Sequence, residues 1–203
     1  MPTPKLTAAD VGAPRLAGTT TQNANRLEIT AGGEDIWGTR DEFHFAHFPV
    51  AGDFSLTTRV ESLVMADVYT KAGIMFRASL AAGAPHALLL AFGDNQPRNN
   101  NNGGLEFQSR LQPDAACTGI YPPQPLPALP DFPASFPNVW LRLQRTGNSF
   151  TGRYSQDGVQ WKTFCTAELA LPAGGLLGFA VTSHNPTRSV QAVFTAWDFS
   201  GQP

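Results

Sequence analysis

The stretch Val139-Trp-Leu-Arg-Leu-Gln-Arg145 sets the fold class, because apolar residues occupy every second position in it. An extended chain points alternate side chains to opposite sides, so Leu141 and Leu143 share one face. Trp140 and Arg142 then share the other face. Such a pattern predicts a β-strand with one face against a core and the other toward solvent, as in antiparallel sheets.

The same alternation recurs in other segments. Lys71-Ala-Gly-Ile-Met-Phe-Arg77 turns Ile74 and Phe76 toward a core, and Leu105-Glu-Phe-Gln-Ser-Arg110 turns Leu105 and Phe107 toward it. We expect about a dozen short strands, spaced by roughly ten to fifteen residues with no helices between them. They cover residues 27–31, 41–48, 54–60, 72–78, 87–92, 105–110, 139–145, 149–155, 159–164, 176–182 and 190–199.

Length and composition agree with one all-β domain. The 203 residues include 19 glycines and 17 prolines, and only 15% are charged, which favours many turns over helical bundles. We predict a single domain over residues 1–203, folded as a two-sheet antiparallel jelly-roll sandwich. Eight of the 17 prolines lie in residues 113–137, where apolar anchors such as Phe132 and Phe136 predict an ordered, extended wrap over the surface.

The charge pattern excludes several classes of partner. The formal net charge is −2 and no run of like charges occurs, so the chain lacks the basic stripe of nucleic-acid-binding proteins. No apolar stretch reaches the roughly 20 residues of a membrane span. Residues 1–10 lack the apolar core of a signal peptide, which leaves two alternatives. The protein is intracellular, or it is extracellular or at the cell surface after removal of a leader.

The cysteines and histidines do not form a metal-binding pattern. Cys117 and Cys165 stand outside any Cys/His spacing typical of a metal site. They form one disulfide in an oxidising compartment or remain two separate thiols, and the sequence leaves both alternatives open. His44 and His47 are an odd number of residues apart in one expected strand, so they point to opposite faces. We therefore expect no metal and no cofactor.

The polar run at residues 94–104 (DNQPRNNNNGG) is a long connection between two expected strands. Its asparagine and aspartate oxygens are the kind of ligand that calcium takes. The run lacks the ordered spacing of acidic residues found in calcium loops, which favours a solvated loop. Whether it binds calcium stays open.

Ser155-Gln-Asp-Gly-Val-Gln-Trp161 predicts a tight hairpin. Asp157 and Gly158 supply the positive φ angles of a two-residue turn, and Trp161 can fold back across the paired strands. We assign these residues a structural role rather than a ligand-binding one.

A series of motifs follows the order of a known family. These motifs are Ala9-Asp-Val-Gly-Ala-Pro-Arg-Leu-Ala-Gly18, Gly33-Glu-Asp-Ile-Trp-Gly38, Asp41-Glu-Phe-His-Phe45, Gly52-Asp53, Lys71-Ala-Gly-Ile-Met-Phe-Arg77, Trp140-Leu-Arg-Leu143, Arg145-Thr-Gly-Asn148, Asp157-Gly158 with Trp161, and Gly178-Phe-Ala-Val-Thr-Ser-His184. From about residue 9 to residue 199, the chain resembles the concanavalin A-like (laminin-G-type) domain of unknown function that includes "regulation of enolase protein 1" relatives and accessory modules of secreted bacterial proteins. The resemblance implies a jelly-roll sandwich with a gently concave sheet, of the kind that lectin-like modules use for ligands. It implies no catalytic residues, because the family has no agreed ones to carry over.

Outward residues of three expected strands define the candidate site. If the strands at 71–77, 105–110 and 139–145 lie in one sheet, their outward side chains share a face. Guanidinium groups suit carboxylates, sulfates and sugar hydroxyls, whereas the alternative is an Arg–Glu ladder that only covers the sheet. If no ligand binds on this face, the alternative location of the binding site is the loops around 99–102 and His184. The candidate ligand-binding residues are Arg77, Glu106, Gln108, Arg110, Trp140 and Arg142.

Three classes of function remain. We predict a non-catalytic binding module for a carbohydrate or another surface ligand, with a glycan or an anionic polymer as its partner. The alternative is a structural or assembly module, such as a sheath, virion or surface-layer component, which forms a homo-oligomer. A glycan-active enzyme has the least support, because Glu34-Asp35 and Asp41-Glu42 do not reproduce the carboxylate spacing of laminarinase-type jelly rolls.

Overall fold

The computed structural model describes residues 4–96, 104–122 and 134–202. In these ranges all regular structure is β-strand, and every strand pair is antiparallel, which confirms the all-β prediction. Within them, no helix has the length and apolarity that a membrane crossing requires. The strands are β1 (Thr7–Val11), β2 (Thr19–Asn23), β3 (Arg26–Ala31), β4 (Ile36–Trp37), β5 (Arg40–Asp41), β6 (Phe43–Leu63), β7 (Lys71–Arg77), β8 (His86–Phe92), β9 (Leu105–Arg110), β10 (Thr118–Ile120), β11 (Val139–Thr146), β12 (Ser149–Ser155), β13 (Lys162–Glu168), β14 (Gly174–Thr182) and β15 (Val190–Gln202).

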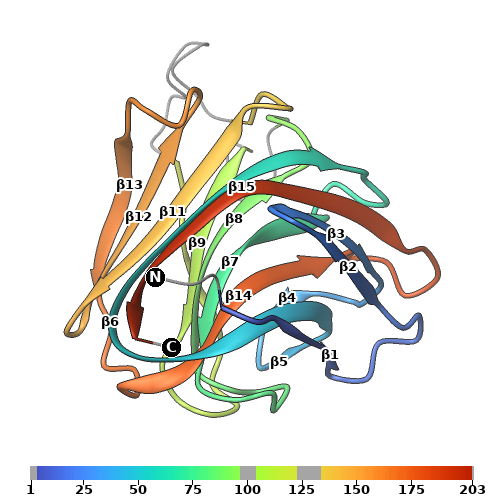
Figure 1. Cartoon of the computed structure of the whole chain (residues 1–203). Coiled ribbons are helices and arrows are strands. Elements are labelled where there is room, and N and C mark those ends of the chain that lie inside the picture. The colour runs from blue at the N-terminus through green and yellow to red at the C-terminus, as the bar shows by residue number, and fades with distance from the viewer. Residues whose placement is uncertain (1–3, 97–103, 123–133, 203) are drawn as a thin grey trace.

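Two layers share the long strand β6, which bends from one layer into the other (Figure 1). Its first half pairs with β1 and β14, and the sheet continues from β14 through β7, β8 and β9 to β10. We call this layer the front sheet. The second half of β6 pairs with β11 and β15, which lead to β12 and β13 on one side and to β3 and β2 on the other. We call this layer the back sheet.

The sequence predicted separate strands at 41–48 and 54–60, and the structure joins most of these residues in β6. Gly52 adopts a φ of 70°, which only glycine takes up readily, and the chain turns there while the strand continues. The sequence also gave no expectation for β1, β2, β4, β5 and β10. These strands are short or polar, so they lack the apolar alternation that identifies a strand from sequence.

The space between the two sheets is filled by apolar side chains from alternate positions of both. The residues expected in the core are all buried there, namely Ile74, Phe76, Leu105, Phe107, Leu141 and Leu143, and Phe179 and Val181 of β14 join them. The alternation in β11 therefore has the predicted register. Its apolar residues face the core, while Trp140 and Arg142 face away from it.

We expect Leu141→Ala to lower the free energy of unfolding by about 2–5 kcal/mol, the usual loss for a fully buried leucine. Leu141 is 0% exposed and lies in the middle of β11, so neighbouring residues cannot fully collapse into the space. Urea denaturation of the wild type and the variant measures the difference. A loss below about half a kcal/mol would contradict this position of Leu141, because even small core truncations cost more.

The outer face of the front sheet carries a second apolar cluster, which the hairpin β4–β5 covers. The cluster consists of Val11, Ile36, Phe43, Phe45, Met75, Leu88, Leu90, Phe92 and Ala180. Ile36 comes from the hairpin itself, so the hairpin packs on the sheet rather than extending into solvent. A cavity opens on this face beside the hairpin.

Two local predictions are corrected or decided by the structure. β12 ends at Ser155 and β13 begins at Lys162, so residues 156–161 form a longer loop instead of a two-residue turn. Asp157 organises this loop, because its Oδ1 accepts hydrogen bonds from the backbone N–H groups of Val159 at 2.8 Å and Gln160 at 2.7 Å. Gly158 has the predicted positive φ, of 74°.

The structure also decides the state of the two cysteines. Cys117 and Cys165 are separate buried thiols, so the disulfide alternative does not hold in this structure. Residues 123–133 of the proline-rich segment, and asparagines 99–102 of the loop considered for calcium, lie outside the described residues.

Candidate functional site

A cavity of about 280 Å³ opens on the outer face of the front sheet. It combines three aromatic side chains with five that carry charge or hydrogen-bonding groups. Alternate positions of β9 provide two of them, the hairpin β4–β5 and the turn before it provide two, and the rest come from β7 and nearby loops. The lining residues are Asp35, Trp37, Tyr69, Lys71, Glu106, Gln108, Tyr121 and His184.

Glu106 and Gln108 face the cavity from β9, because residues two apart in a strand share a face. The Gln108 side-chain amide donates a hydrogen bond to Glu106 Oε1 at 2.7 Å. Gln108 Oε1 is enclosed and accepts no hydrogen bond from any residue that the structure describes. On the neighbouring strand, a Cβ added to Gly119 would lie 2.9 Å from the Tyr121 ring and 3.0 Å from Glu106 Oε1. Tyr121 and Glu106 therefore pack directly against the Gly119 backbone, where a side chain at residue 119 would collide with them.

Charged groups on the other side of the cavity form a linked set. Lys71 Nζ donates hydrogen bonds to Asp35 Oδ1 at 2.5 Å and to the Ile36 carbonyl at 3.1 Å. His184 Nε2 lies 3.4 Å from Asp35 Oδ2, and its Nδ1 lies 3.0 Å from Asp67 Oδ1. The Tyr69 ring packs against the imidazole with the ring centroids 5.1 Å apart. These contacts fix the hairpin to β7 and hold His184 in the wall.

The linked set shifts two pKa values in opposite directions. The hydrogen bond with Asp35, helped by the charges of Asp35 and Asp67, raises the pKa of His184 above its ordinary value despite partial burial. Burial alone would raise the pKa of Asp35, but the hydrogen bond with His184 and the charge of Lys71 outweigh it, so the pKa of this carboxyl is lowered. The lowered pKa keeps the Asp35 carboxylate ionised near neutral pH.

These shifts predict a pH dependence of stability. A histidine whose pKa is raised by folding contributes stability that is complete below the unfolded pKa of about 6.5 and is lost as pH rises through the folded pKa. We therefore expect the wild type to lose stability relative to His184→Gln as pH rises above 6.5. Urea midpoints of both proteins across this range measure the difference. Parallel pH curves would mean that the imidazole gains no proton affinity from Asp35 and Asp67.

Below pH 6.5 other histidines act with the opposite sign. Burial lowers the pKa of His47, and it lowers the pKa of His86 to about 3, so each binds a proton more weakly when folded. Both shifts reduce stability as pH falls below the unfolded value of about 6.5. Both residues are present in wild type and variant, so their effect cancels in the comparison.

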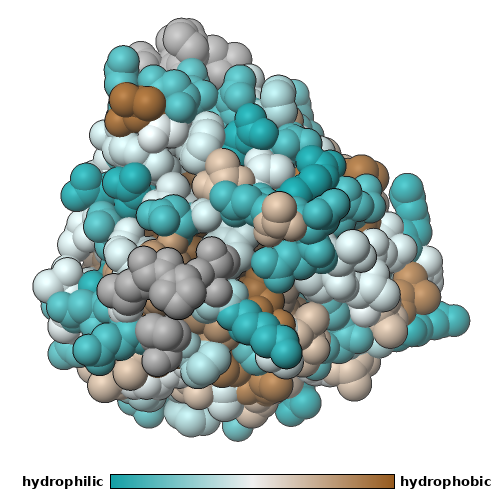
Figure 2. Space-filling model, in the orientation of Figure 1, coloured by the Kyte–Doolittle hydropathy of each residue, from teal (hydrophilic) through white to brown (hydrophobic). Residues whose placement is uncertain are grey.

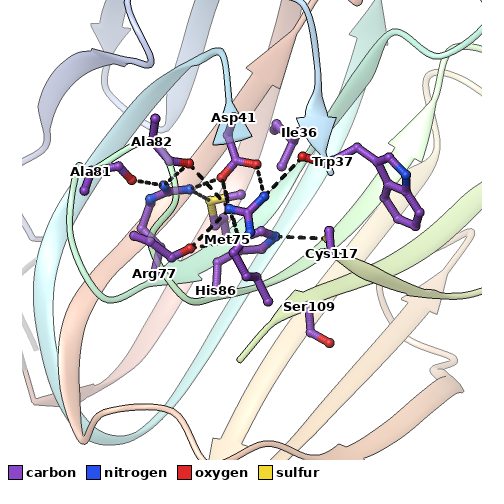
Figure 3. A network of polar contacts seen from close by, with 12 residues as sticks. Ile36, Trp37, Asp41, Met75, Arg77, Ala81, Ala82, His86, Ser109 and Cys117 are labelled. Atoms are coloured by element: carbon purple, nitrogen blue, oxygen red, sulfur yellow. Dashed lines mark hydrogen bonds and ion pairs between the residues drawn. The ribbon is translucent and has the colours of Figure 1, made fainter. Parts of the chain in front are cut away.

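Two of the predicted site residues, Arg77 and Arg110, are buried instead of outward and accessible. Both guanidinium groups contact Asp41 at the end of the hairpin (Figure 3), and all three side chains are 0% exposed. Arg110 donates from Nη1 to Asp41 Oδ2 at 2.7 Å and from Nη2 to Oδ1 at 2.8 Å, while Arg77 Nη1 donates to Oδ2 at 3.0 Å. The sequence placed both arginines on the correct face of the sheet, but it did not predict that a hairpin would cover them.

The remaining hydrogen bonds of these arginines go to backbone carbonyls. Arg110 Nη2 donates to the carbonyls of Trp37 at 3.1 Å and Gly38 at 3.0 Å, and Arg77 Nε donates to that of Ser79 at 2.7 Å. Next to them, burial raises the pKa of the Cys117 thiol to about 12, so this cysteine stays protonated and unreactive. The network therefore has a structural role, which is to fix the hairpin that carries Trp37.

Trp140 and Arg142 lie in a different sheet from the other candidates. They belong to β11 of the back sheet and point away from the core, so the prediction of one face shared by three strands is wrong. Sequence alternation gave their orientation correctly but could not give the order of strands. Of the six predicted residues, Glu106 and Gln108 alone line the front cavity.

A chain of three polar side chains at the other edge of the front sheet has the order of a catalytic triad. His44 Nδ1 lies 2.6 Å from Asp10 Oδ1, and His44 Nε2 lies 2.9 Å from Thr20 Oγ1. A Cβ added to Gly18 would lie 2.2 Å from the imidazole, so this backbone covers the ring. These contacts hold the N-terminal segments against β6, so we assign Asp10, His44 and Thr20 a structural role.

Sequence reasoning missed most of the cavity lining. Asp35 and Trp37 were quoted as part of a motif, and Tyr69 and His184 precede or follow expected strands, but no spacing connects these four residues. Of the residues that were missed, the sequence pointed only to His184, because its loop was the alternative location predicted for the ligand site. The others meet only because the hairpin folds over the front sheet.

The chain resembles solved structures in fold. A functionally unknown protein from Saccharomyces cerevisiae matches with a TM-score of 0.66 and 16% identity over 97% of both chains. A carbohydrate-binding module from Bacillus subtilis matches with a TM-score of 0.58 and 13% identity over 96% of this chain and 95% of that one. Lectin I-B4 from Griffonia simplicifolia matches with a TM-score of 0.53 and 10% identity over 95% of this chain and 92% of that one.

The fold is the jelly roll of lectins and carbohydrate-binding modules. This confirms the predicted concanavalin A-like sandwich. The sequence matches no family model and no curated protein. At these identities the structural likeness establishes the fold alone, so the site must be argued from its own residues.

Proposed function

We propose that this domain is a non-catalytic binding module for carbohydrate and that the ligand lies in the front cavity. The observation that carries the proposal is the composition of that cavity, which combines aromatic rings with hydrogen-bonding side chains around one space. A sugar presents apolar C–H faces and polar hydroxyl edges, and a site of this kind matches both. The jelly-roll neighbours support the same ligand class.

The aromatic side chains provide the apolar part of the site. Trp37, Tyr69 and Tyr121 are each partly exposed and come from three separate segments around the cavity. Their rings give stacking surface at little conformational cost, since each side chain has few rotatable bonds. Stacking would orient a sugar ring so that its hydroxyls point toward Glu106 and Gln108.

The acceptor groups on β9 provide the polar part. A buried acceptor without a donor costs about 1–3 kcal/mol, so the unused Gln108 Oε1 is an unfavourable feature of the free protein. A sugar hydroxyl or a bound water can donate to it. Glu106 lies beside it as a second acceptor, and its carboxylate strengthens any hydrogen bond that a hydroxyl donates.

The finer family assignment is part of this proposal. The ordered motifs resemble the domain of "regulation of enolase protein 1" relatives, and the yeast structure of unknown function matches this chain over nearly its whole length. The motifs support the family assignment, and the yeast structure supports the shared fold. Trp37, in the Gly33–Gly38 motif, and His184, at the end of the Gly178–His184 motif, both line the front cavity.

A glycan array run beside a measurement of mass in solution tests the proposal. We expect a monomer that binds a restricted set of neutral or weakly acidic glycans and leaves them chemically unchanged. An oligomer that binds no glycan would support the assembly alternative instead. Cleavage of a bound glycan, detected by mass spectrometry, would support an enzyme.

The surface gives a first indication on assembly. On the side of the molecule drawn in Figure 2, hydrophobic side chains stand in small groups among hydrophilic ones. Scattered exposed apolar residues are normal for monomers, whereas large apolar patches mark association surfaces. The exposed large apolar residues among those described are Val64, Val68, Leu80, Leu111, Ile120 and Val159.

A further inference from the structure

The outer face of the back sheet brings two arginines next to each other on adjacent strands. Arg142 in β11 is directly opposite Arg153 in β12, and both side chains point away from the core. Opposed side chains in an antiparallel pair have Cβ atoms about 4.5–5.5 Å apart, and like charges at this position are destabilising. In this pair, the charge of Arg153 contributes to a lowered pKa of Arg142, after the larger effect of burial.

Neither guanidinium forms an ion pair with a described residue, and the charge of Asp198, which acts to raise the pKa of Arg142, does not outweigh burial and the charge of Arg153. Arg142 Nε donates to Thr57 Oγ1 at 2.8 Å, and its two Nη groups donate to no described residue. Arg153 makes no hydrogen bond or ion pair with any part of the chain that the structure describes, and its Nε is enclosed without an acceptor. The other arginines on this face, Arg59 and Arg26, differ because both form ion pairs with Glu61, at 2.9 Å and 2.6 Å.

The position of Arg142 is fixed in advance. Its guanidinium lies over the Trp161 ring, with the carbon of the guanidinium 3.9 Å from the ring centroid. Trp161 is itself held by a hydrogen bond from its Nε1 to the Gly158 carbonyl at 3.1 Å. An arginine that is stacked and bonded through Nε keeps its Nη groups pointing in one direction, so little freedom is lost when an anion binds.

We propose that Arg142 and Arg153 form a binding site for an oxoanion, namely the sulfate or carboxylate group of an acidic polysaccharide. Two guanidinium groups side by side present donors that match the oxygens of such a group. Binding also removes the repulsion between them, so the unfavourable pair in the free protein becomes favourable in the complex. The site lies on the opposite sheet from the front cavity and does not depend on the function proposed for that cavity.

Because the net charge of the chain is slightly negative, binding of acidic oligomers is a specific test of the site. The whole chain carries a formal charge of −2, so it does not attract polyanions non-specifically. Isothermal titration calorimetry with dextran sulfate oligomers, polygalacturonate oligomers and neutral dextran separates sulfate from carboxylate and from the sugar backbone. We expect binding to one or both acidic oligomers and none to neutral dextran.

Four variants locate the binding. Arg142→Gln and Arg153→Gln are each expected to weaken it about tenfold or more, the loss that accompanies one charge-assisted hydrogen bond. Arg15→Gln removes the same charge from an exposed residue elsewhere, and Gln108→Met alters the front cavity, so both should bind like the wild type. Failure of all acidic oligomers to bind, or an equal loss in Arg15→Gln, would overturn the proposal.

Thermal stability without ligand distinguishes a site from a structural contact. Arg153→Gln relieves the like-charge pair, so its melting temperature should equal or exceed that of the wild type at low salt. A lower melting temperature would assign Arg153 a structural role and overturn the proposal. In Gln108→Met, normal binding of acidic oligomers with loss of neutral glycans would show the two sites to be independent.

Discussion

Asp41→Asn should lower the free energy of unfolding by about 3–5 kcal/mol, the cost of leaving buried charges without their partner. Asp41 is the counter-charge for Arg77 and Arg110, and all three side chains are 0% exposed. Asparagine keeps the size of the side chain but removes its charge and one acceptor. The two guanidinium groups then remain close together in a site from which water is excluded.

Urea denaturation of wild type and variant at one pH measures this loss. Glu28→Gln is the matched control, because Glu28 pairs with Arg26 at 3.0 Å while both side chains are 43% exposed. An exposed pair contributes at most about 1 kcal/mol, so this variant should stay close to the wild type. Equal losses in the two variants would mean that the Asp41 network does not hold the hairpin in place.

The same variant links stability to the site. The hairpin β4–β5 contributes Trp37, and the turn before it contributes Asp35, to the cavity. Loosening of the hairpin should therefore weaken glycan binding even where most of the protein remains folded. Comparison of tryptophan fluorescence with far-ultraviolet circular dichroism distinguishes local loosening from global unfolding.

The sequence predicted the fold well because the signal for it is local. Leu141 and Leu143 face the core as their alternation required, and Phe76 and Phe107 do the same from other strands. Period-two alternation depends only on the geometry of an extended chain. The joining of two expected strands into β6 was not predicted, because Gly52 reads as a turn whether or not pairing continues through it.

The site was predicted only in part because it depends on tertiary contacts. The faces of Glu106 and Gln108 followed from alternation, and both line the cavity. Alternation does not say which strands are neighbours, so Trp140 was assigned to the wrong sheet. Alternation also cannot predict that another segment packs on a strand face. Arg77 and Arg110 would be accessible if the hairpin with Asp41 did not pack over them.

Trp37→Ala and Tyr121→Ala should each weaken binding of an array-selected neutral glycan by roughly thirtyfold, which corresponds to about 2 kcal/mol for an aromatic residue at the centre of an interface. Both rings border the cavity from independent segments, so loss in each would place the ligand between them. Trp140→Ala is the matched control, because it removes an aromatic ring that faces outward from the back sheet. We expect its affinity to equal that of the wild type.

A third substitution tests the location of the ligand without deleting an aromatic side chain. Gly119→Ala places a methyl group 2.9 Å from the Tyr121 ring and 3.0 Å from Glu106 Oε1, so both side chains must move from their positions at the cavity although no contact residue is deleted. Titration calorimetry should show weaker binding in this variant, and circular dichroism should show an unchanged fold. If Trp140→Ala abolished binding while Gly119→Ala and Trp37→Ala left it intact, the glycan would lie on the back sheet, and the front cavity would lose its assigned role.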